Sequence, residues 1–554
     1  MSRRLSACVR RSADRGAVAA QPLLFGFGTD GADRQFLPWL AQNVAAVFTI
    51  LLSIVLIVLL GALVYALWRE LRRSTIVLDP LEVPRELIER GYTPAVVTER
   101  LLNAIHTIQN VANTQKPRRG HVASALEADI HIPVGQLSIK SLARYFRQLL
   151  DFPDLHVAGE ITRDGDQLTL QLRRRDGSLM AFARPRTAAE VGPLIDGGAE
   201  EVVRLTDPYV LASYYIEQEL PGPEFPKTAE ALTHVIDTRP DEAPWARNLQ
   251  GLLLLNRNEN AAALDVLRRG FEADPNLQSP VSEEYMTALV RAGRVDEASR
   301  IVDAAASRPL SSLQRTRVAW CNVMLGRYRL ASRQFRRVLA TRRGQAYATL
   351  GLAICHWRSH RYRESISAFE TFFRLRGHGW TGVQNYVCVL LELGRQDDAV
   401  RIAEELFARF PAESAAMAAL ARVRLSQDRA AEAAELAEAG TKRWALRPLN
   451  WYCWGEALRV LGDPEAAIAK FRQLIAQEIP SRPESLTGWA RALMQLGRHD
   501  EAMAKFAEGE SIDKDNARNC LHWGEALHRI GRTSEGDAMI ARAHALAAKQ
   551  GVAL

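Results

Sequence analysis

The sequence predicts a mainly α-helical fold, a solenoid of about nine or ten stacked helical hairpins preceded by a single transmembrane helix and a small α+β domain. Three observations predict it. A short pattern recurs at a fixed period along residues 208–554, an uncharged apolar segment covers residues 44–68, and residues 75–205 alternate between helical and strand patterns. Of the 554 residues, 47% are hydrophobic, which is enough for several folded cores.

Residues 1–43 are typical of a flexible tail, and they contain the letters GFGTDG. Gly26, Gly28 and Gly31 formally match the GxGxxG pattern of dinucleotide-binding loops. Such a loop needs a preceding strand and a following helix, whereas this tail leads into an apolar segment. The pattern therefore predicts no cofactor site, and we expect neither a cofactor nor a metal in this chain.

Residues 44–68, VAAVFTILLSIVLIVLLGALVYALW, contain no charged side chain over 25 positions. That length is sufficient to cross a bilayer with some tilt. Trp39 and Trp68 lie where interfacial aromatic residues are expected. A cleaved signal peptide has a shorter apolar run and begins near the amino terminus, so we expect this segment to remain as an anchor.

Residues 75–205 combine helical and strand patterns. Thr93 and Pro94 are typical of a helix start, and two Asp-Gly turns, at Gly165 and Gly177, separate runs of alternating polarity. We therefore expect helices packed against an antiparallel sheet. The expected helices cover residues 93–115, 138–150 and 187–206, and the expected strands cover 128–134 and three runs within 155–185.

The remaining residues repeat one pattern: LELGRQDDAV at 391–400 has counterparts in QLGRHDEAM at 495–503 and RAGRVDEAS at 291–299. A small residue closes each copy, at intervals of 33 to 35 residues. A period near 34 predicts helical hairpins that hide their apolar faces against their neighbours. The small residues are Ala263, Ala298, Ala331, Ser365, Ala399, Ala433, Ala467, Ala502 and Gly536.

One unit, beginning at Trp451, shows what each position does. Trp451 belongs to an apolar face at helical spacing, and Gly462 lies where a helix ends in a positive-φ residue. Asp463 stands at the start of the second helix, where a carboxylate meets unpaired backbone N–H groups. Ala467 is small enough for close helix approach, and Phe471 fills the core between hairpins.

These positions resemble the tetratricopeptide repeat (TPR), whose pattern of Trp, Leu, Gly or Ala, Tyr, Ala, Phe and Pro they follow. The resemblance covers nine units between residue 208 and the end, and an irregular tenth unit is expected at 209–240. Arg424, His356 and Gly536 depart from the pattern. The resemblance implies a stack of helix pairs with a concave surface that binds a protein partner.

The family's groove positions, carried over residue by residue, identify a candidate binding surface. Trp320 and Trp357 have an alternative placement in the hairpin core, because one residue of register decides between groove and core. The Lys/Asn clamp that some relatives use for a carboxyl terminus is missing. We expect the groove to contain Arg291, Trp320, Trp357, Arg358, Tyr452, Arg459 and Arg491, with Asn248 and Arg529 in or near it. We also expect charge reversal at Arg358 and Arg459 to spare the fold.

An Arg follows the turn of seven units, and these residues predict a row along one edge of the stack. The row is either a solvated edge paired with neighbouring acids or a ladder for an acidic partner or an anionic lipid. Its members are Arg294, Arg327, Arg361, Arg395, Arg429, Arg498 and Arg532.

Residues 75–205 are similar to the TolB-amino-terminal-like modules that precede TPR arrays in bacterial membrane-anchored proteins. The similarity lies in IVLDPLEVPRELIERGYTPAVVTERLLNAI, HVAGEITRDGDQLTLQLRRRDGSLMAFA and AEEVVRLTDPYVLASYY. It implies a binding or assembly role for this domain.

The charges flanking the apolar segment conflict on topology. Arg69, Arg72 and Arg73 follow the span directly, which favours a cytoplasmic carboxyl side, and five cysteines in the repeats suit a reducing compartment. The tail, however, carries six Arg and three Asp, which favours a cytoplasmic tail, and relatives of the small domain lie outside the inner membrane. We expect a single-pass protein of a bacterial inner membrane with periplasmic carboxyl domains, and the cytoplasmic alternative stays open.

Catalytic motifs are absent from the sequence: it has no HExxH, CxxC pair, P-loop or nucleophile elbow. Cys355 with His356 and Cys520 with His522 are more typical of packing than of catalysis, because no orienting acid accompanies them. A net charge of +7 with intermixed acids does not favour nucleic-acid binding. We therefore predict a non-enzymatic, membrane-anchored scaffold that binds a protein partner. The alternative is a structural spacer or self-assembling component without a dedicated ligand, of unknown oligomeric state.

Overall fold

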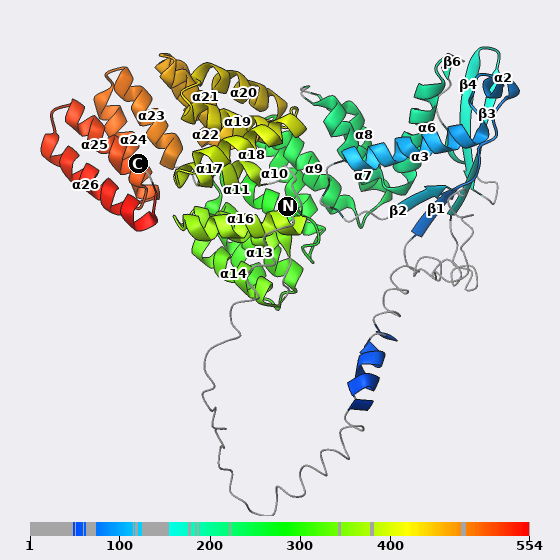
Figure 1. Ribbon diagram of the computed structural model, residues 1–554, viewed down its shortest axis with the longest axis horizontal. Coiled ribbons are helices and arrows are strands. Elements are labelled where there is room, and N and C mark those ends of the chain that lie inside the picture. The colour runs from blue at the N-terminus through cyan, green and yellow to red at the C-terminus, as the bar shows by residue number, and fades with distance from the viewer. Residues whose placement is uncertain are drawn as a thin grey trace, which may run out of the picture. The chain divides into compact units, whose positions relative to one another are not determined.

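The structure is a computed structural model (Figure 1). Ser74–Ile130 and Asp154–Leu554 belong to one compact unit, in which all the contacts below occur. The described residues are 48–49, 51–58, 60–61, 74–112, 114, 116, 120–124, 155–174, 179–182, 186–187, 189–220, 222, 224–341, 345–376, 382–477, 483–552 and 554.

The expected transmembrane segment lies only partly within the described residues. Residues 48–49, 51–58 and 60–61 are helical, and their apolar side chains are exposed, for example Ile57 at 67%. Among the described residues, no helix is both long and apolar enough to cross a membrane. The remainder of 44–68 and the whole tail, 1–43, lie outside the described part, so the anchor stays a prediction.

Six strands form one mixed sheet with the order β2-β1-β3-β4-β5, and β6 pairs with β4. The strands expected within 155–185 are present as β3, β4 and β5. The expectation of an antiparallel sheet was wrong, because β1 runs parallel to both β2 and β3. The expected elements at 128–134 and 138–150 lie outside the described residues. The strands are β1 (Ser74–Leu78), β2 (Gly120–Ser124), β3 (Leu155–Asp164), β4 (Gln167–Arg174), β5 (Leu179–Phe182) and β6 (Arg186–Thr187).

The long helices α3 (Pro94–Val111) and α6 (Val191–Thr206) accompany this sheet, with the short α2 (Arg85–Glu89) preceding them. The hydroxyl of Thr93 accepts a hydrogen bond from the Val96 N–H at 3.4 Å, which confirms the predicted helix start. Leu101 of α3 and Leu170 of β4 are fully buried in one core. α6 packs against β4 and α3 packs against α6, so the sheet and the two helices share that core.

Successive helical hairpins make up the described residues from 208 onward, as the 34-residue period predicted (Figure 1). Ten hairpins are present in this range, and the first corresponds to the irregular unit. The pairs are α7 (Pro208–Glu219) with α8 (Pro226–Thr238), α9 (Ala243–Asn256) with α10 (Asn260–Glu272), α11 (Val281–Arg291) with α12 (Val295–Ala306), α13 (Ser312–Met324) with α14 (Tyr328–Thr341), α15 (Ala346–Trp357) with α16 (Tyr362–Arg376), α17 (Val383–Glu392) with α18 (Gln396–Arg409), α19 (Ser414–Ser426) with α20 (Ala430–Arg443), α21 (Pro448–Val460) with α22 (Pro464–Gln477), α23 (Pro483–Gln495) with α24 (His499–Ile512), and α25 (Ala517–Arg529) with α26 (Thr533–Gln550).

Among the described residues, the turns of nine hairpins, all but that between α7 and α8, use the same backbone conformation. Gly462 has φ +89°, as predicted for a residue that ends a helix, and Asp463 then accepts a hydrogen bond from the Ala466 N–H at 3.0 Å. Asn258, His360 and Asp428 take the glycine's place in three units, at φ between 56° and 64°. The repeated turn therefore depends on a left-handed residue, which need not be glycine.

The core between hairpins is a column of large side chains at the repeat period. Phe335, Phe369, Phe471 and Phe506 are all fully buried. A Cβ on Gly455 would lie 2.8 Å from the Phe471 ring, so that glycine permits the close approach of α21 and α22. The sequence reading of these positions as packing residues is therefore confirmed.

Candidate functional site

The aromatic residues expected in a groove lie in or against the hairpin core. Trp320 is 7% exposed, and its ring centroid lies 4.8 Å from that of Tyr347 and 5.7 Å from that of Phe335. Trp357 is partly buried against two core clusters, and Tyr452 packs on Phe471 with ring centroids 6.3 Å apart. For Trp320 the core placement, which the sequence left open, is the one observed.

The expected groove arginines have intramolecular partners. Arg459 and Arg491 donate to the same carboxylate, that of Glu456, at 2.9 and 3.1 Å. Arg358 donates to the Tyr328 hydroxyl at 3.2 Å, whereas Arg529 is exposed. The Glu456 side chain is only 9% exposed, so reversing the charge of Arg459 places two acids together in a buried position. In place of the expectation that this reversal spares the fold, we therefore expect Arg459→Glu to destabilise its hairpin.

Arg291 donates to the Asn258 side chain at 3.2 Å. Burial lowers the pKa of Arg291, while its guanidinium still stays protonated at neutral pH.

Six of the seven arginines in the row after the turns pair with acids, as the milder interpretation proposed. Arg395 donates to Asp398 at 2.6 Å, and four other members have a Glu three residues later as their partner. Arg327 instead pairs with Asp303 at 2.6 Å. These pairs are exposed, so each contributes little to stability, and they neutralise most of the row's charge.

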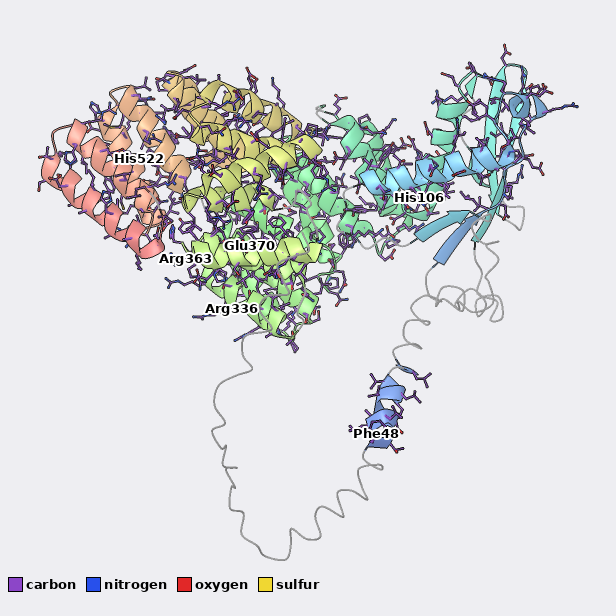
Figure 2. The ribbon with its side chains drawn as sticks, in the orientation of Figure 1. Phe48, His106, Arg336, Arg363, Glu370 and His522 are labelled. Atoms are coloured by element: carbon purple, nitrogen blue, oxygen red, sulfur yellow. The ribbon has the colours of Figure 1, made fainter. Side chains whose placement is uncertain are left out.

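The two Cys–His pairs lack the surroundings that activate a thiol. Burial raises the pKa of Cys355 to about 12 and lowers the pKa of His356 to about 4, so both are neutral at physiological pH. Burial also raises the pKa of Cys520 and lowers that of His522, which lies on α25 (Figure 2). A nucleophilic cysteine needs the opposite shift.

Hairpins that are distant in sequence contact one another. The Arg443 guanidinium, at the end of α20, donates to the Glu217 carboxylate at 2.7 Å and to the Leu220 carbonyl at 2.8 Å. Nearby, the Leu446 N–H donates to the Asn256 side chain at 3.2 Å, and Trp444 packs against the core shared by α7 to α9. The connection between α20 and α21 thus rests on the first two hairpins.

A second long-range contact involves the last hairpins. His360, in the turn between α15 and α16, lies 2.7 Å from the carboxylate of Asp513, which follows α24. Arg518 of α25 pairs with Glu392 of α17 at 3.3 Å. Burial lowers the pKa of His360, but the hydrogen bond and charge of Asp513 outweigh it, so the net pKa is raised. The middle and final hairpins are therefore held together by charged contacts.

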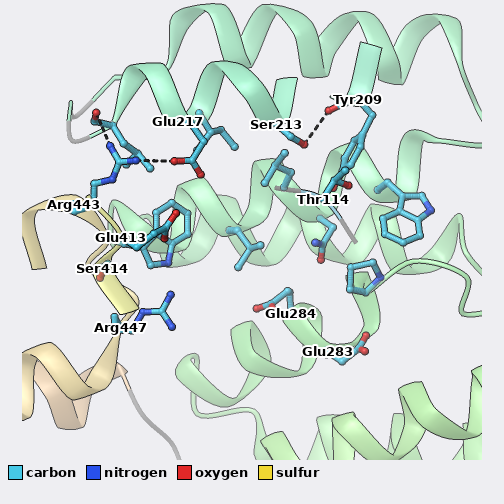
Figure 3. Close-up of a pocket in the computed structure, with 18 of the residues that line it drawn as sticks. Thr114, Tyr209, Ser213, Glu217, Glu283, Glu284, Glu413, Ser414, Arg443 and Arg447 are labelled. Atoms are coloured by element: carbon cyan, nitrogen blue, oxygen red, sulfur yellow. Dashed lines mark hydrogen bonds and ion pairs between the residues drawn. The ribbon is translucent and has the colours of Figure 1, made fainter. Parts of the chain in front are cut away.

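The first long-range contact encloses a cavity of about 500 Å³, here termed the chamber (Figure 3). Its walls come from α7, α9, α11, α15 and α16, and from the residues at and around α19 to α21. Tyr209, Trp245, Tyr347 and Trp444 supply aromatic walls. A volume of this size is typical of sites that bind small molecules or side chains.

Charged side chains line the chamber, and most have a partner. Glu217 pairs with Arg443, while Glu283 accepts from Arg317 at 2.9 Å with both side chains 6% exposed. Burial lowers the pKa of Arg447 to about 10, against the opposing charge of Glu413. Arg447 is therefore charged at neutral pH, and its Nη1 donates to Gln384 at 3.2 Å.

Glu284 differs from these residues. Burial and the charge of the adjacent Glu283 raise the pKa of Glu284 to about 7, and no cation acts to lower it. Among the described residues, its carboxylate has no hydrogen-bond or ion-pair partner. Asn248, on the neighbouring helix α9, is 4% exposed and its Oδ1 likewise has no partner in that part of the chain. The chamber therefore contains a carboxylate and an amide oxygen that accept no hydrogen bond from the described residues.

The sequence identified Asn248 only through the family's groove positions, and it did not identify Glu284. Glu283 and Glu284 lie in the first turn of α11, where the helix dipole alone accounts for acids. The sequence does not predict the long-range contact of Arg443, because no pattern within a repeat indicates which distant hairpins contact one another. Without that contact, the chamber residues cannot be identified from the sequence.

Comparisons with known proteins agree with the hairpin fold. The tetratricopeptide repeat family model matches residues 324–374, 387–448 and 452–517. No curated protein sequence matches this chain.

Several solved structures match part of this chain. The Cut9–Hcn1 hetero-tetramer of the APC/C is 15% identical, with a TM-score of 0.41, over 58% of this chain and 63% of that chain. The human IFIT1 dimer with m7Gppp-AAAA is 15% identical, with a TM-score of 0.40, over 61% of this chain and 83% of that chain. A tetratricopeptide repeat protein from Parabacteroides merdae is 13% identical, with a TM-score of 0.30, over 42% of this chain and 93% of that chain. The family match and the stacked hairpins together support a tetratricopeptide-repeat protein.

Proposed function

We propose that this protein is a membrane-anchored scaffold that binds a protein partner through its repeats, with the chamber as the principal contact site. Tetratricopeptide repeats themselves indicate a protein-interaction scaffold. The chamber is the observation that carries the proposal, because stacking of hairpins does not require a carboxylate without a cationic partner and an unpaired amide oxygen in the lining of one cavity. A buried polar group without a partner has a free-energy cost, which a bound partner removes.

The placement in the cell belongs to the same proposal. Residues 44–68 anchor the chain in a bacterial inner membrane, and the small domain, which resembles TolB-amino-terminal-like modules, lies with the repeats on the periplasmic side. The excess of Arg over Asp in the tail and this resemblance support the assignment, whereas the arginines directly after the span oppose it. The test is a carboxyl-terminal fusion to a reporter that functions only in the cytoplasm. Activity of that reporter would contradict the periplasmic assignment.

The groove proposed at Arg291, Trp357 and Arg459 remains a second contact surface. Its residues are held by intramolecular contacts, so a partner there must displace existing pairs or use their exposed edges. A partner that binds Glu284 and Asn248 in the chamber displaces no existing pair, and we therefore propose the chamber as the principal contact site.

Site-specific crosslinking tests the proposal. The photoreactive residue p-benzoylphenylalanine is placed at Leu252, a partly buried chamber residue on α9, in the full-length chain. The matched control places it at Leu330, which is 40% exposed on α14 and does not line the chamber. The proposal predicts a discrete heavier product from Leu252 and none from Leu330.

The alternative function, a self-assembling spacer, gives a different result. In that case crosslinking yields only products of twice the chain mass, and light scattering shows a mass that rises with concentration. Absence of any product from Leu252 in the native host, with efficient photoactivation, would refute partner binding at the chamber.

A further inference from the structure

We infer that the chamber receives one cationic group, a guanidinium or primary ammonium on an aliphatic chain, which binds the Glu284 carboxylate and the Asn248 amide oxygen. This inference rests on the proposed function and gives the chemistry of the contact. The shared chemistry has two sources, an Arg or Lys side chain of a partner segment and a free organic cation.

The charge balance of the chamber calls for a cation. Glu217 and Glu283 already have arginine partners at 2.7 and 2.9 Å, and Glu413 lies within the field of Arg447. After these pairings, Glu284 is left with an acidic neighbour and no opposing charge among the described residues. One added positive charge neutralises it, whereas an added anion meets four carboxylates against the two guanidinium groups of Arg443 and Arg447.

The unpaired amide oxygen of Asn248 is an independent indication of a donor ligand. Asn248 is 96% buried, and its Oδ1 accepts no hydrogen bond within the described part of the chain. An amide oxygen accepts hydrogen bonds and cannot donate them, so it selects N–H or O–H groups. α9 and α11 pack directly against each other, which places Asn248 and Glu284 on adjacent walls. Guanidinium and ammonium groups carry enough donors for both.

The protein holds one of its own ammonium groups in the same way, next to the chamber. Lys116 is 6% exposed; its Nζ donates to Asp207 at 2.9 Å and to Glu242, and lies 5.3 Å from the centre of the Tyr209 ring. Tyr209 is also a wall of the chamber. Acids combined with an aromatic face thus bind an alkylammonium here, and the chamber repeats that combination.

The aromatic walls support a cation on an aliphatic stem. Tyr347 already lies under the Arg317 guanidinium, at 5.6 Å from its ring centre. Trp245 and Trp444 add apolar area that can cover methylene groups. Figure 3 shows Glu284 and Arg447 projecting into the space from different walls, so the ligand's charge sits at the Glu284 side.

The binding is expected to depend on pH near neutrality, because Glu284 must be ionised. Its pKa of about 7 means that the carboxylate gains its charge as pH rises through 7, so affinity for a cation increases over that range. Other charged or titratable groups also face the chamber: Glu217 and Glu283 lie in ion pairs with arginines, and burial raises the pKa of Glu413. These groups are Tyr209, Glu217, Glu283, Tyr347, Glu413, Arg443 and Arg447, and Arg317 is the ion-pair partner of Glu283.

Calorimetric titration of the full-length chain at pH 8 tests the inference. The probes are agmatine, spermidine, a blocked pentapeptide with one central Arg among alanines, and inorganic phosphate. The variants are Glu284→Gln and Asn248→Leu, and the matched control is Glu224→Gln, an exposed glutamate outside the chamber. Circular dichroism confirms folding of each variant.

We expect one cation per chain, binding weakened roughly tenfold or more by Glu284→Gln, and no change with Glu224→Gln. Asn248→Leu should weaken binding less, because it removes a neutral acceptor. The increase in affinity through pH 7 should vanish in Glu284→Gln. Binding of the peptide alone identifies a partner segment as the source, whereas binding of agmatine or spermidine shows that a free cation suffices.

Phosphate binding without cation binding would overturn the inference, as would equal cation affinity in Glu284→Gln and the control. Absence of cation binding at millimolar concentration, together with a partner crosslinked at Leu252, would remove the inference and leave the proposed function standing. Cation binding without any crosslinked partner would leave the inference standing and remove the proposed function.

Discussion

Replacing Lys116 with Met should loosen the junction between the small domain and the first hairpins. Lys116 precedes β2, and its ammonium group bridges Asp207, just before α7, and Glu242, just before α9. All three side chains are at most 7% exposed. Methionine has a similar length without charge, so the substitution removes the ion pairs and keeps most of the packing.

The expected cost follows from the burial of the two acids. Removing one partner from a buried ion pair costs about 3–5 kcal/mol, because the remaining charge is left uncompensated. Two charge-assisted hydrogen bonds at about 1.5–3 kcal/mol each give a similar total. We therefore expect local opening of α7 and α9 to become more favourable by about 3–5 kcal/mol, roughly a 150- to 4,000-fold change in the opening equilibrium.

Hydrogen exchange read by mass spectrometry measures this change helix by helix. Exchange should accelerate in α7 and α9 and stay unchanged in α25 and α26, which are remote in the stack. The triple variant Lys116→Met, Asp207→Asn, Glu242→Gln removes all three charges and should recover most of the protection. A change below about 1 kcal/mol at α7, or equal acceleration at α25, would refute the argument from burial.

Three further predictions concern stability. Glu284→Gln should stabilise the unliganded chain by about 1–3 kcal/mol at pH 8, because the raised pKa of Glu284 makes wild-type stability fall as pH rises from about 4.5 through 7. Equal melting temperatures of the variant and the wild type at pH 8 would contradict this. Gly351→Ala should destabilise by about 1–3 kcal/mol in denaturant titration, because its Cβ would lie 2.2 Å from Phe335, whereas Gly192→Ala, with nothing within 4 Å, should not destabilise. The His360–Asp513 contact should be fully formed below about pH 6.5 and lost as pH rises through the raised His360 pKa, so wild-type melting temperatures should fall over that range more than those of His360→Gln.

The repeats could be predicted from the sequence because each unit carries its own local signals. Gly462 and Asp463 mark a turn and a helix start through backbone chemistry that acts within a few residues. Phe471 recurs at the period of the stack and is buried where the pattern placed it. Repetition multiplied these signals, so departures at His356 or Gly536 did not obscure the fold.

The sheet was predicted less completely, because part of it depends on pairing between distant segments. β3 and β4 form a hairpin whose Asp-Gly turn is visible in the sequence. β1 and β2 pair in parallel across α3, and parallel strands need such a long connection. Nothing local distinguishes the five residues of β1 from a connection that leads out of the apolar segment.

The candidate site was the hardest part to predict. Trp320 lies in the core. The sequence could not decide this, because one residue of register determines which face of the helix a side chain takes. Arg459 and Arg491 share the carboxylate of Glu456 on α21, and the repeat pattern does not predict this pairing. The chamber lies where Arg443 contacts Glu217, 226 residues away in sequence. Such contacts follow from the curvature of the whole stack, which repeat patterns do not encode.

Competition between a small cation and the partner tests the central claim most directly, because it joins the chamber's chemistry to its function. The full-length chain with p-benzoylphenylalanine at Leu252 is irradiated in its native host membranes with and without saturating agmatine. We predict that agmatine suppresses the crosslinked product, and that the captured segment contains an Arg or Lys next to the crosslinked residue. Undiminished crosslinking at full agmatine occupancy, or a captured segment without a cationic residue, would contradict the account.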